Sequence, residues 1–118
     1  MNKIFRIRER RDFVKISQVS FYFRADSIMV QCGFNNLDIY RAGFTASKKV
    51  GNAVVRNRCK RRMRAVADMV LNEAGLAGVD YVFIAKKSTF DANWSDLVDK
   101  ATFAINFLNN KISKCKKF

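Results

Sequence analysis

A short stretch of the chain concentrates positive charge. The nine residues from Arg56 to Arg64, "RNRCKRRMR", hold six cations and no acid, and the wider segment 42–67 holds eight cations and no acid. Solvated helix faces normally mix charges of both signs at i,i+4 spacing. A cluster of one sign repels itself unless phosphates neutralise it. The stretch therefore predicts a surface that binds a polyanion; an ordinary solvated face and an anionic membrane surface are weaker alternatives.

The composition of the whole chain supports the same interpretation. The 118 residues carry a formal net charge of +13, from 23 Lys+Arg against 10 Asp+Glu. Such an imbalance is typical of nucleic-acid-binding proteins. There is no histidine, which excludes the commonest general base and most zinc sites.

The number and spacing of the cysteines, and the lack of long apolar segments, indicate where in the cell the protein is expected. Cys32, Cys59 and Cys115 have no metal-ligand spacing, and their number is odd. The N-terminus is charged and has no apolar run typical of a signal peptide. No segment approaches the roughly 20 apolar residues of a membrane span. We therefore expect a cytoplasmic protein in a reducing environment, with no membrane partner.

The elements that must position the cations follow from periodicity. We expect a single domain over 1–118, with residues 1–8 as a flexible basic arm. Apolar spacing predicts helices at 9–18, 52–73 and 93–112, and strands at 20–24, 27–33, 39–47 and 80–86. Asn52 is the expected N-cap of the central helix, and Gly75 ends it. The order α-β-β-β-α-β-α predicts an α+β fold, a two-layer α-β sandwich with a four-stranded sheet.

A helical wheel separates the central helix into two sides. With about 100° per residue, a stripe roughly 80° wide is apolar and predicted to be buried; it contains Val55, Cys59, Met63, Val66 and Val70. The opposite side contains Arg56, Asn57, Lys60, Arg61 and Arg64, and the margins hold Arg58 and Arg62. The wheel predicts a cationic outer surface but does not decide between RNA and DNA. No helix-turn-helix or zipper accompanies it.

Four segments of the chain resemble the protein component of bacterial ribonuclease P. The residues "SKKVGNAVVRNRCKRRMR" (47–64) resemble the Arg-Asn-Arg signature of that family. The segments "RIRERRDF" (6–13), "RAGFTASKK" (41–49) and "DYVFIAKK" (80–87) resemble its first helix and the strands on either side of the signature. The resemblance spans most of the chain.

The resemblance implies a function and a fold. The family's proteins assist a catalytic RNA in removing the 5′ leader of precursor tRNA by Mg²⁺-dependent hydrolysis, with Mg²⁺ bound mainly by the RNA. The implied partners are ribonuclease P RNA and precursor tRNA, with no obligate protein partner. The implied fold is that of a ribosomal protein domain, with a left-handed β-α-β crossover through the basic helix. No residue of the chain is expected to be catalytic or to bind metal.

The resemblance also implies site residues. The predicted RNA-binding set is Lys48, Lys49, Arg56, Asn57, Arg58, Lys60, Arg61 and Arg64. The predicted leader-binding cleft contains Phe13, Gln31, Thr45 and Ser47. Five of these residues have a structural alternative: Arg58 could pair with a backbone carbonyl or an acid, Asn57 could be a spacer, Phe13 could belong to the core, and Thr45 and Ser47 could be ordinary hydroxyls.

The chain departs from the family pattern in its cleft aromatics. Ser17 and Gln31 stand where the family often has aromatic residues, so stacking is the part of the cleft least supported here; Tyr22 is a candidate substitute. Two other functions remain open at this stage: a basic RNA-binding protein of ribosomal type, and a DNA-binding regulator.

Overall fold

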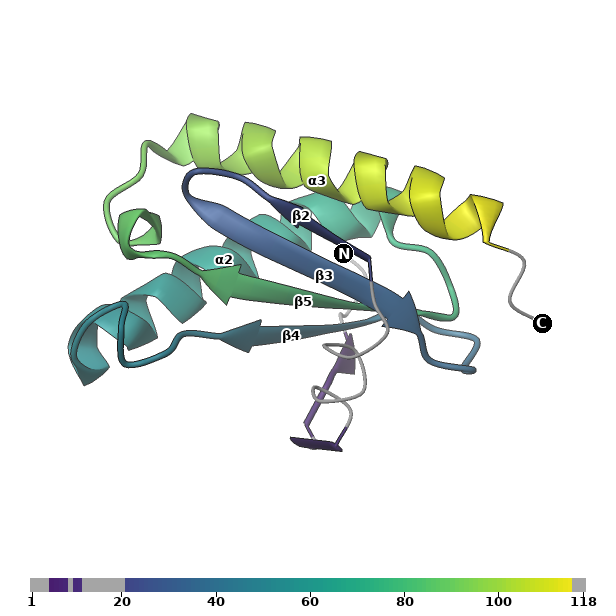
Figure 1. Cartoon of the computed structure of the whole chain (residues 1–118), viewed down its shortest axis with the longest axis horizontal. Coiled ribbons are helices and arrows are strands. Elements are labelled where there is room, and N and C mark those ends of the chain that lie inside the picture. The colour runs from purple at the N-terminus through teal and green to yellow at the C-terminus, as the bar shows by residue number, and fades with distance from the viewer. Residues whose placement is uncertain (1–4, 9, 12–20, 116–118) are drawn as a thin grey trace.

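The computed structural model describes residues 5–8, 10–11 and 21–115. Its elements form two layers, with two long helices packed on one face of a sheet (Figure 1). In chain order they are β1 (Phe5–Arg6), β2 (Phe21–Arg24), β3 (Ile28–Phe34), β4 (Arg41–Thr45), α2 (Ala53–Ala74), β5 (Val79–Ala85), the short 3₁₀ helix η1 (Lys87–Thr89) and α3 (Trp94–Lys114). The expected α+β class is confirmed.

The expectation of four strands is wrong. The sheet has five strands in the order β1-β4-β5-β3-β2. The fifth is β1, in the segment assigned to the basic arm, and it pairs in parallel with β4. Two residues are too few to show an alternating pattern, so periodicity could not reveal this strand. Its partner strand, β4, would otherwise be an unpaired sheet edge.

Two of the three expected helices lie within the described residues. The helix expected at 9–18 falls outside them, apart from residues 10 and 11, which are helical. Phe13 and Ser17 are therefore among the residues that the structure does not describe. No helix of the described segments is long and apolar enough to cross a membrane.

The connection from β4 through α2 to β5 joins two parallel neighbours of the sheet. In Figure 1 both strands point to the left, β5 lies above β4, and α2 passes behind the sheet. This arrangement is a left-handed crossover, the hand that general rules make rare. It places the start of α2 beyond the carboxyl end of β4.

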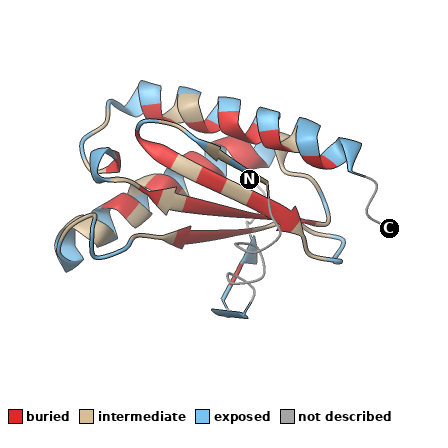
Figure 2. Ribbon diagram, viewed as in Figure 1, coloured by how far each residue is buried: buried red, intermediate tan, exposed pale blue. Residues whose placement is uncertain are grey.

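The hydrophobic core lies between the sheet and the two helices. Side chains alternate across each strand, and Figure 2 shows the buried positions along the strands and on the inner sides of the helices. Fully buried side chains include Ile28, Val30, Met63, Val66, Leu71, Tyr81, Phe83, Leu97, Ile105 and Leu108. On the other face of the sheet, Ile7 and Val82 form a second, smaller buried cluster.

The sequence correctly predicts both ends of α2. The Asn52 side chain accepts a hydrogen bond from the Val55 amide at 3.0 Å, which satisfies one of the free amides of the first turn. At the other end the Gly75 amide donates to the Leu71 carbonyl. A Cβ at Gly75 would lie 2.7 Å from the Tyr40 ring, so this close approach requires glycine.

The buried side of α2 is wider than the predicted stripe. Val55 is only half-buried, whereas Ala67 and Leu71 are fully buried. On the same wheel the buried residues span about 20° to 160°, which brings Arg64 to the border of the core. The reason is that α2 contacts α3 as well as β4 and β5, and two neighbours bury more of a helix than one.

A polar network ties α3 to the end of α2. The buried Tyr81 hydroxyl donates to the Asn109 side-chain oxygen at 2.6 Å and accepts from the Leu76 amide at 3.1 Å. The Asn109 amide group donates to the Ala74 carbonyl at 2.7 Å. Burial raises the pKa of the Tyr81 phenol well above its ordinary value. These bonds satisfy groups that the end of α2 leaves free.

A second polar group is buried where β4 and β5 begin. Asp80 is 2% exposed and forms a two-pronged ion pair with Arg41, with contacts of 2.9 and 2.6 Å. The Asn35 amide group donates to the same carboxylate at 2.8 Å. Because the partners are neighbours in the strand register, the pair holds the beginnings of the two strands together.

Candidate nucleic-acid interface

The cations of α2 fall into three groups that differ in what they contact. Arg61 is exposed and available to a partner, as is the neutral side chain of Asn57. Arg58 and Arg62 point toward the segment that precedes α3. The remaining three, Arg56, Lys60 and Arg64, are half-buried. The cations of α2 therefore have different roles, although they carry the same charge.

Arg62 is bound to backbone carbonyls of the chain itself. Its guanidinium donates to the carbonyl oxygens of Thr89, Phe90 and Ala92 at 2.6, 3.0 and 2.5 Å. It also lies over the Trp94 ring, 5.8 Å from the centroid. Hydrogen bonds from a charged donor are about twice as strong as neutral ones. Arg62 thus fastens the segment between η1 and α3 to α2.

Arg58 makes a weaker version of the same contact. Its Nε donates to the Phe90 carbonyl at 3.2 Å, and its guanidinium lies 5.1 Å from the Phe90 ring centroid. The backbone-carbonyl contact considered for Arg58 is therefore present. Because the side chain is still exposed, the contact leaves its place in the predicted RNA-binding set untested.

The half-buried row on α2 faces toward β4. The residues Arg56, Lys60 and Arg64 follow each other at four-residue spacing on one side of the helix. The Arg64 guanidinium lies 5.9 Å from the Phe44 ring centroid. Arg56 and Arg64 each have a buried Nε that finds no hydrogen-bond acceptor among the described residues. Packing therefore restrains these cations, which lowers the entropy that ligand binding would remove.

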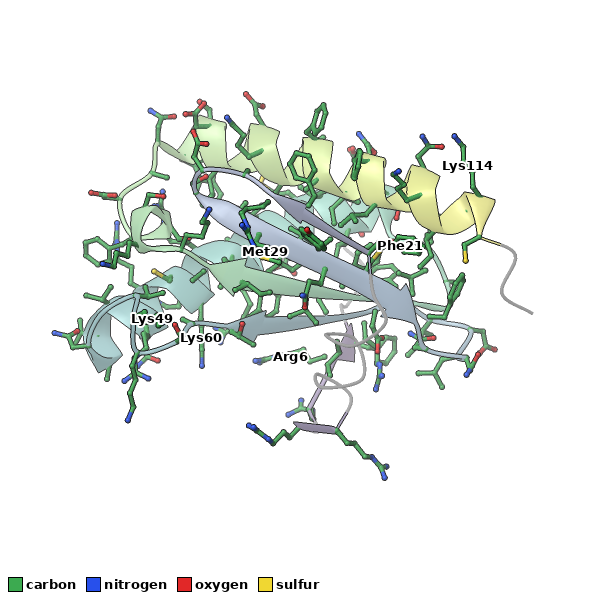
Figure 3. The ribbon with its side chains drawn as sticks, in the orientation of Figure 1. Arg6, Phe21, Met29, Lys49, Lys60 and Lys114 are labelled. Carbon is green, nitrogen blue, oxygen red and sulfur yellow. The ribbon has the colours of Figure 1, made fainter. Side chains whose placement is uncertain are left out.

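The turn before α2 brings two more lysines to this end of the helix. Lys48 and Lys49 are exposed, as is Ser47, whose carbonyl accepts from the Val50 amide. Gly51 has φ of +156°, and a Cβ there would lie 2.8 Å from Val55. Figure 3 shows Arg6, Lys49 and Lys60 along the β4 side of the molecule. The positive end of the α2 dipole lies in the same region.

Two of the predicted cleft residues share one face of the sheet. Gln31 is on β3 and Thr45 on β4, and strand alternation directs both away from α2 and α3. They are separated by β5, that is, by about 10 Å across the strands. Ser47 lies beyond the end of β4, in the turn, while Phe13 is outside the described residues.

Tyr22 occupies the same face, next to Gln31. The two are register partners across β2 and β3, and Tyr22 is 57% exposed. An aromatic ring thus lies beside the position where the resemblance leads one to expect a tyrosine. At the other edge of this face, Ile7 packs against Val82 and Ile84.

The comparisons with known proteins decide the family. The sequence model of the family described as Ribonuclease P matches residues 1–108. The chain belongs to the ribonuclease P protein family. Its sequence is 41% identical over 107 residues to the ribonuclease P protein component of Ruegeria pomeroyi, with 87% of this chain and 85% of that protein covered.

Solved ribonuclease P proteins have the same fold. The structure from Staphylococcus aureus superposes with a TM-score of 0.74 at 25% identity, covering 89% of this chain and 95% of the other. The structure from Thermotoga maritima superposes with a TM-score of 0.73 at 26% identity, covering 89% and 96%. Residues 1–108, which the family model matches, contain every predicted site residue.

Two thiols of this ribonuclease P protein, those of Cys32 and Cys59, are buried. Burial raises the pKa of the Cys32 thiol to about 12 and raises that of Cys59, against the opposing effect of Arg62 and Arg58. The thiols of these buried cysteines are therefore protonated at neutral pH. Among the residues that the structure describes, no three histidine, cysteine or acidic side chains gather as a metal site would require.

Sequence reasoning did not assign a role to Arg62. The helical wheel indicated only that Arg62, like Arg58, lies at the margin of the apolar stripe. The partners of both are backbone carbonyls about thirty positions away in the sequence, and these become neighbours only after the crossover is formed.

Proposed function

We propose that this protein binds the RNA subunit of ribonuclease P through the start of α2 and holds the 5′ leader of precursor tRNA on the face of its sheet opposite α2 and α3. Family membership makes it the protein component of an endoribonuclease that matures the 5′ ends of tRNAs. The observation that supports the proposal most is the segment 42–67, which presents eight cations without one acid.

The RNA-binding surface is proposed to consist of the exposed and half-buried cations. Arg61, with Lys48 and Lys49, provides mobile charge for phosphates, while Arg56, Lys60 and Arg64 provide charge restrained by packing. Asn57 adds an exposed hydrogen-bonding group. Arginine suits such a surface because its planar group binds phosphate with two parallel hydrogen bonds.

The leader is proposed to cross the face that carries Gln31, Thr45 and Tyr22. This face is separated from the helices by the sheet itself, so it can bind RNA without disturbing the core. Phe13 precedes β2 in the chain and is proposed to add a stacking surface. Ser47 lies between the two regions and is proposed to contact the leader where it approaches the cations.

Mg²⁺ is proposed to act from the RNA subunit. The described residues offer no cluster of carboxylates to hold it, and the cationic surface would repel it. The protein's own part is to bind, to orient the leader and to neutralise phosphate charge. Mg²⁺ bound by the RNA supplies the activation of the attacking water.

Reconstitution tests the proposal. The protein is added to a bacterial ribonuclease P RNA at low Mg²⁺, where charge neutralisation by the protein matters most, and cleavage of precursor tRNA is measured. We expect cleavage to rise with added protein and the protein alone to be inactive. An Arg61→Gln variant should need more protein for the same effect. A basic protein of ribosomal type would bind the RNA without raising leader removal, and that outcome would refute the proposal.

A further inference from the structure

A row of aromatic and basic side chains, half-buried at Lys100 and exposed at the other positions, follows one side of α3. Phe103 is 60% exposed and Phe107 is 38% exposed. Both rings lie 5.2 Å, centroid to centroid, from the half-buried ring of Phe23 on β2. Three phenyl rings in contact, two of them open to solvent, form an apolar surface that the core does not explain.

Lysines flank this aromatic surface. The positions Lys100, Phe103, Phe107, Lys111 and Lys114 are spaced three or four apart, so they share one side of the helix. The Lys111 ammonium lies 5.5 Å from the Phe107 ring centroid. From Lys100 to the end of α3 there is no acid. Aromatic rings interleaved with cations are typical of surfaces that bind single-stranded nucleic acid.

The surface continues from the proposed leader-binding face. β2 is an end strand of the described sheet, and its side chains alternate between the two faces, as in any strand. Tyr22 is on the leader side, next to Gln31, and Phe23 is on the α3 side, against Phe103 and Phe107. A path of aromatic rings therefore leads from one face of the sheet around its edge to the other.

The charge of the chain favours an anionic partner for this aromatic surface. A second copy of the chain would bring another net charge of +13 against this one, which opposes association. An anionic partner with planar apolar groups satisfies both the lysines and the exposed rings. Single-stranded RNA has these properties because each base offers a flat face to stack on an aromatic ring.

We propose that nucleotides of the 5′ leader upstream of those on the sheet pass over β2 and stack on Phe103 and Phe107, with Lys100, Lys111 and Lys114 near their phosphates. This inference rests on the proposed function, since it extends the path of the same leader. It predicts that the affinity for precursor tRNA depends on the length of the leader, and that α3 supplies this dependence.

The test uses the holoenzyme and two precursors of one tRNA. Their leaders have about four and about sixteen nucleotides, the limits of site size in single-strand-binding folds. The variant combines Phe103→Leu and Phe107→Leu, which keeps apolar volume but removes the flat rings. The control is Met69→Ala, since Met69 is an exposed apolar residue on α2. Thermal melts check that each variant folds.

We expect the double variant to lose affinity for the long-leader precursor on the order of fivefold per lost stack and to bind the short-leader precursor and the mature tRNA normally. Equal losses for all three RNAs would mean that the surface contacts the RNA subunit or the tRNA body, and no loss would mean that it binds no RNA; either result overturns the inference. If wild-type holoenzyme instead failed to distinguish the short-leader precursor from mature tRNA, the proposed leader-binding face itself would be wrong.

Discussion

Arg62 on α2 donates a hydrogen bond to the carbonyl oxygen of Thr89, at 2.6 Å, across 27 positions of sequence. The same guanidinium binds two further carbonyls of the segment leading into α3. Arg62 belongs to a cationic stretch, yet its hydrogen bonds are internal. Within α2, the substitutions that lower stability should therefore differ from those that weaken RNA binding.

Changing Arg62 to Ala should lower the free energy of unfolding by about 2–3 kcal/mol, since a hydrogen bond from a charged donor is worth about 1.5–3 kcal/mol and three are lost from a partly exposed site. Arg61→Ala is the matched control, because Arg61 is exposed and should change stability by less than about 0.5 kcal/mol. Urea denaturation of both variants measures the difference. Equal effects would contradict the fastening role of Arg62.

Reversing the charge of Arg61 to Glu should leave the fold intact and weaken RNA binding. Each lost phosphate contact lowers the salt slope of binding by up to about 0.9 for duplex-like partners and about 0.7 for single strands. Salt titrations of RNA affinity measure the slope. Val66→Asp provides the opposite case: it buries an unpaired charge among fully buried residues and should cost several kcal/mol of stability. Unfolding of Arg61→Glu would mean that this side of α2 is not exposed.

Tyr81 should make stability depend on alkaline pH. Its folded-state pKa is raised above the unfolded value, so its contribution is fully present below about pH 10, the unfolded pKa, and is lost as the pH rises above it. Tyr81→Phe should therefore lose less stability than the wild type between about pH 9 and pH 11. At neutral pH it should be less stable by about 1–3 kcal/mol, because Leu76 and Asn109 lose a partner. Tyr22→Phe, at an exposed position, is the control, and chemical denaturation at each pH is the measurement.

Phe13 and Gln31 should affect precursor tRNA selectively. Phe13→Ala is expected to weaken binding of precursor more than of mature tRNA, by about 1 kcal/mol, the low end of the contribution of a base stacked on an aromatic ring. Gln31→Tyr should have the reverse effect, because it places a ring beside Tyr22 on the same face. Equilibrium binding of both RNAs to the holoenzyme measures the selectivity. If Phe13→Ala weakened both equally, or prevented folding, Phe13 would be a core residue.

The sequence was sufficient to predict the elements that local signals specify. Asn52 and Gly75 mark the ends of α2 through interactions within one turn, and the dense apolar run of β5 is recognisable because the strand is covered on both faces. β1 could not be predicted in this way, because its two residues are held by backbone bonds to a distant strand.

The site was predictable to the extent that it depends on charge. The wheel correctly placed Arg61 and Asn57 on the outside, but its buried stripe began at Val55 and was too narrow, and it therefore placed Arg64 fully outside. The position of Arg64 depends on Phe44 in β4, and the internal bonds of Arg62 depend on the segment before α3. Both depend on how α2 packs across the sheet, and a helical wheel carries no information about that packing.

The one-sign surface around α2 also has a consequence for the life of the protein in a cell. Mutual repulsion of these cations destabilises the free fold, and bound RNA removes that repulsion while stabilising the folded state by mass action. An unassembled copy is therefore the least stable form of the molecule and the one that proteases degrade most readily. We expect the abundance of the protein to follow the supply of its RNA, so that the two subunits are matched in number without a dedicated regulator.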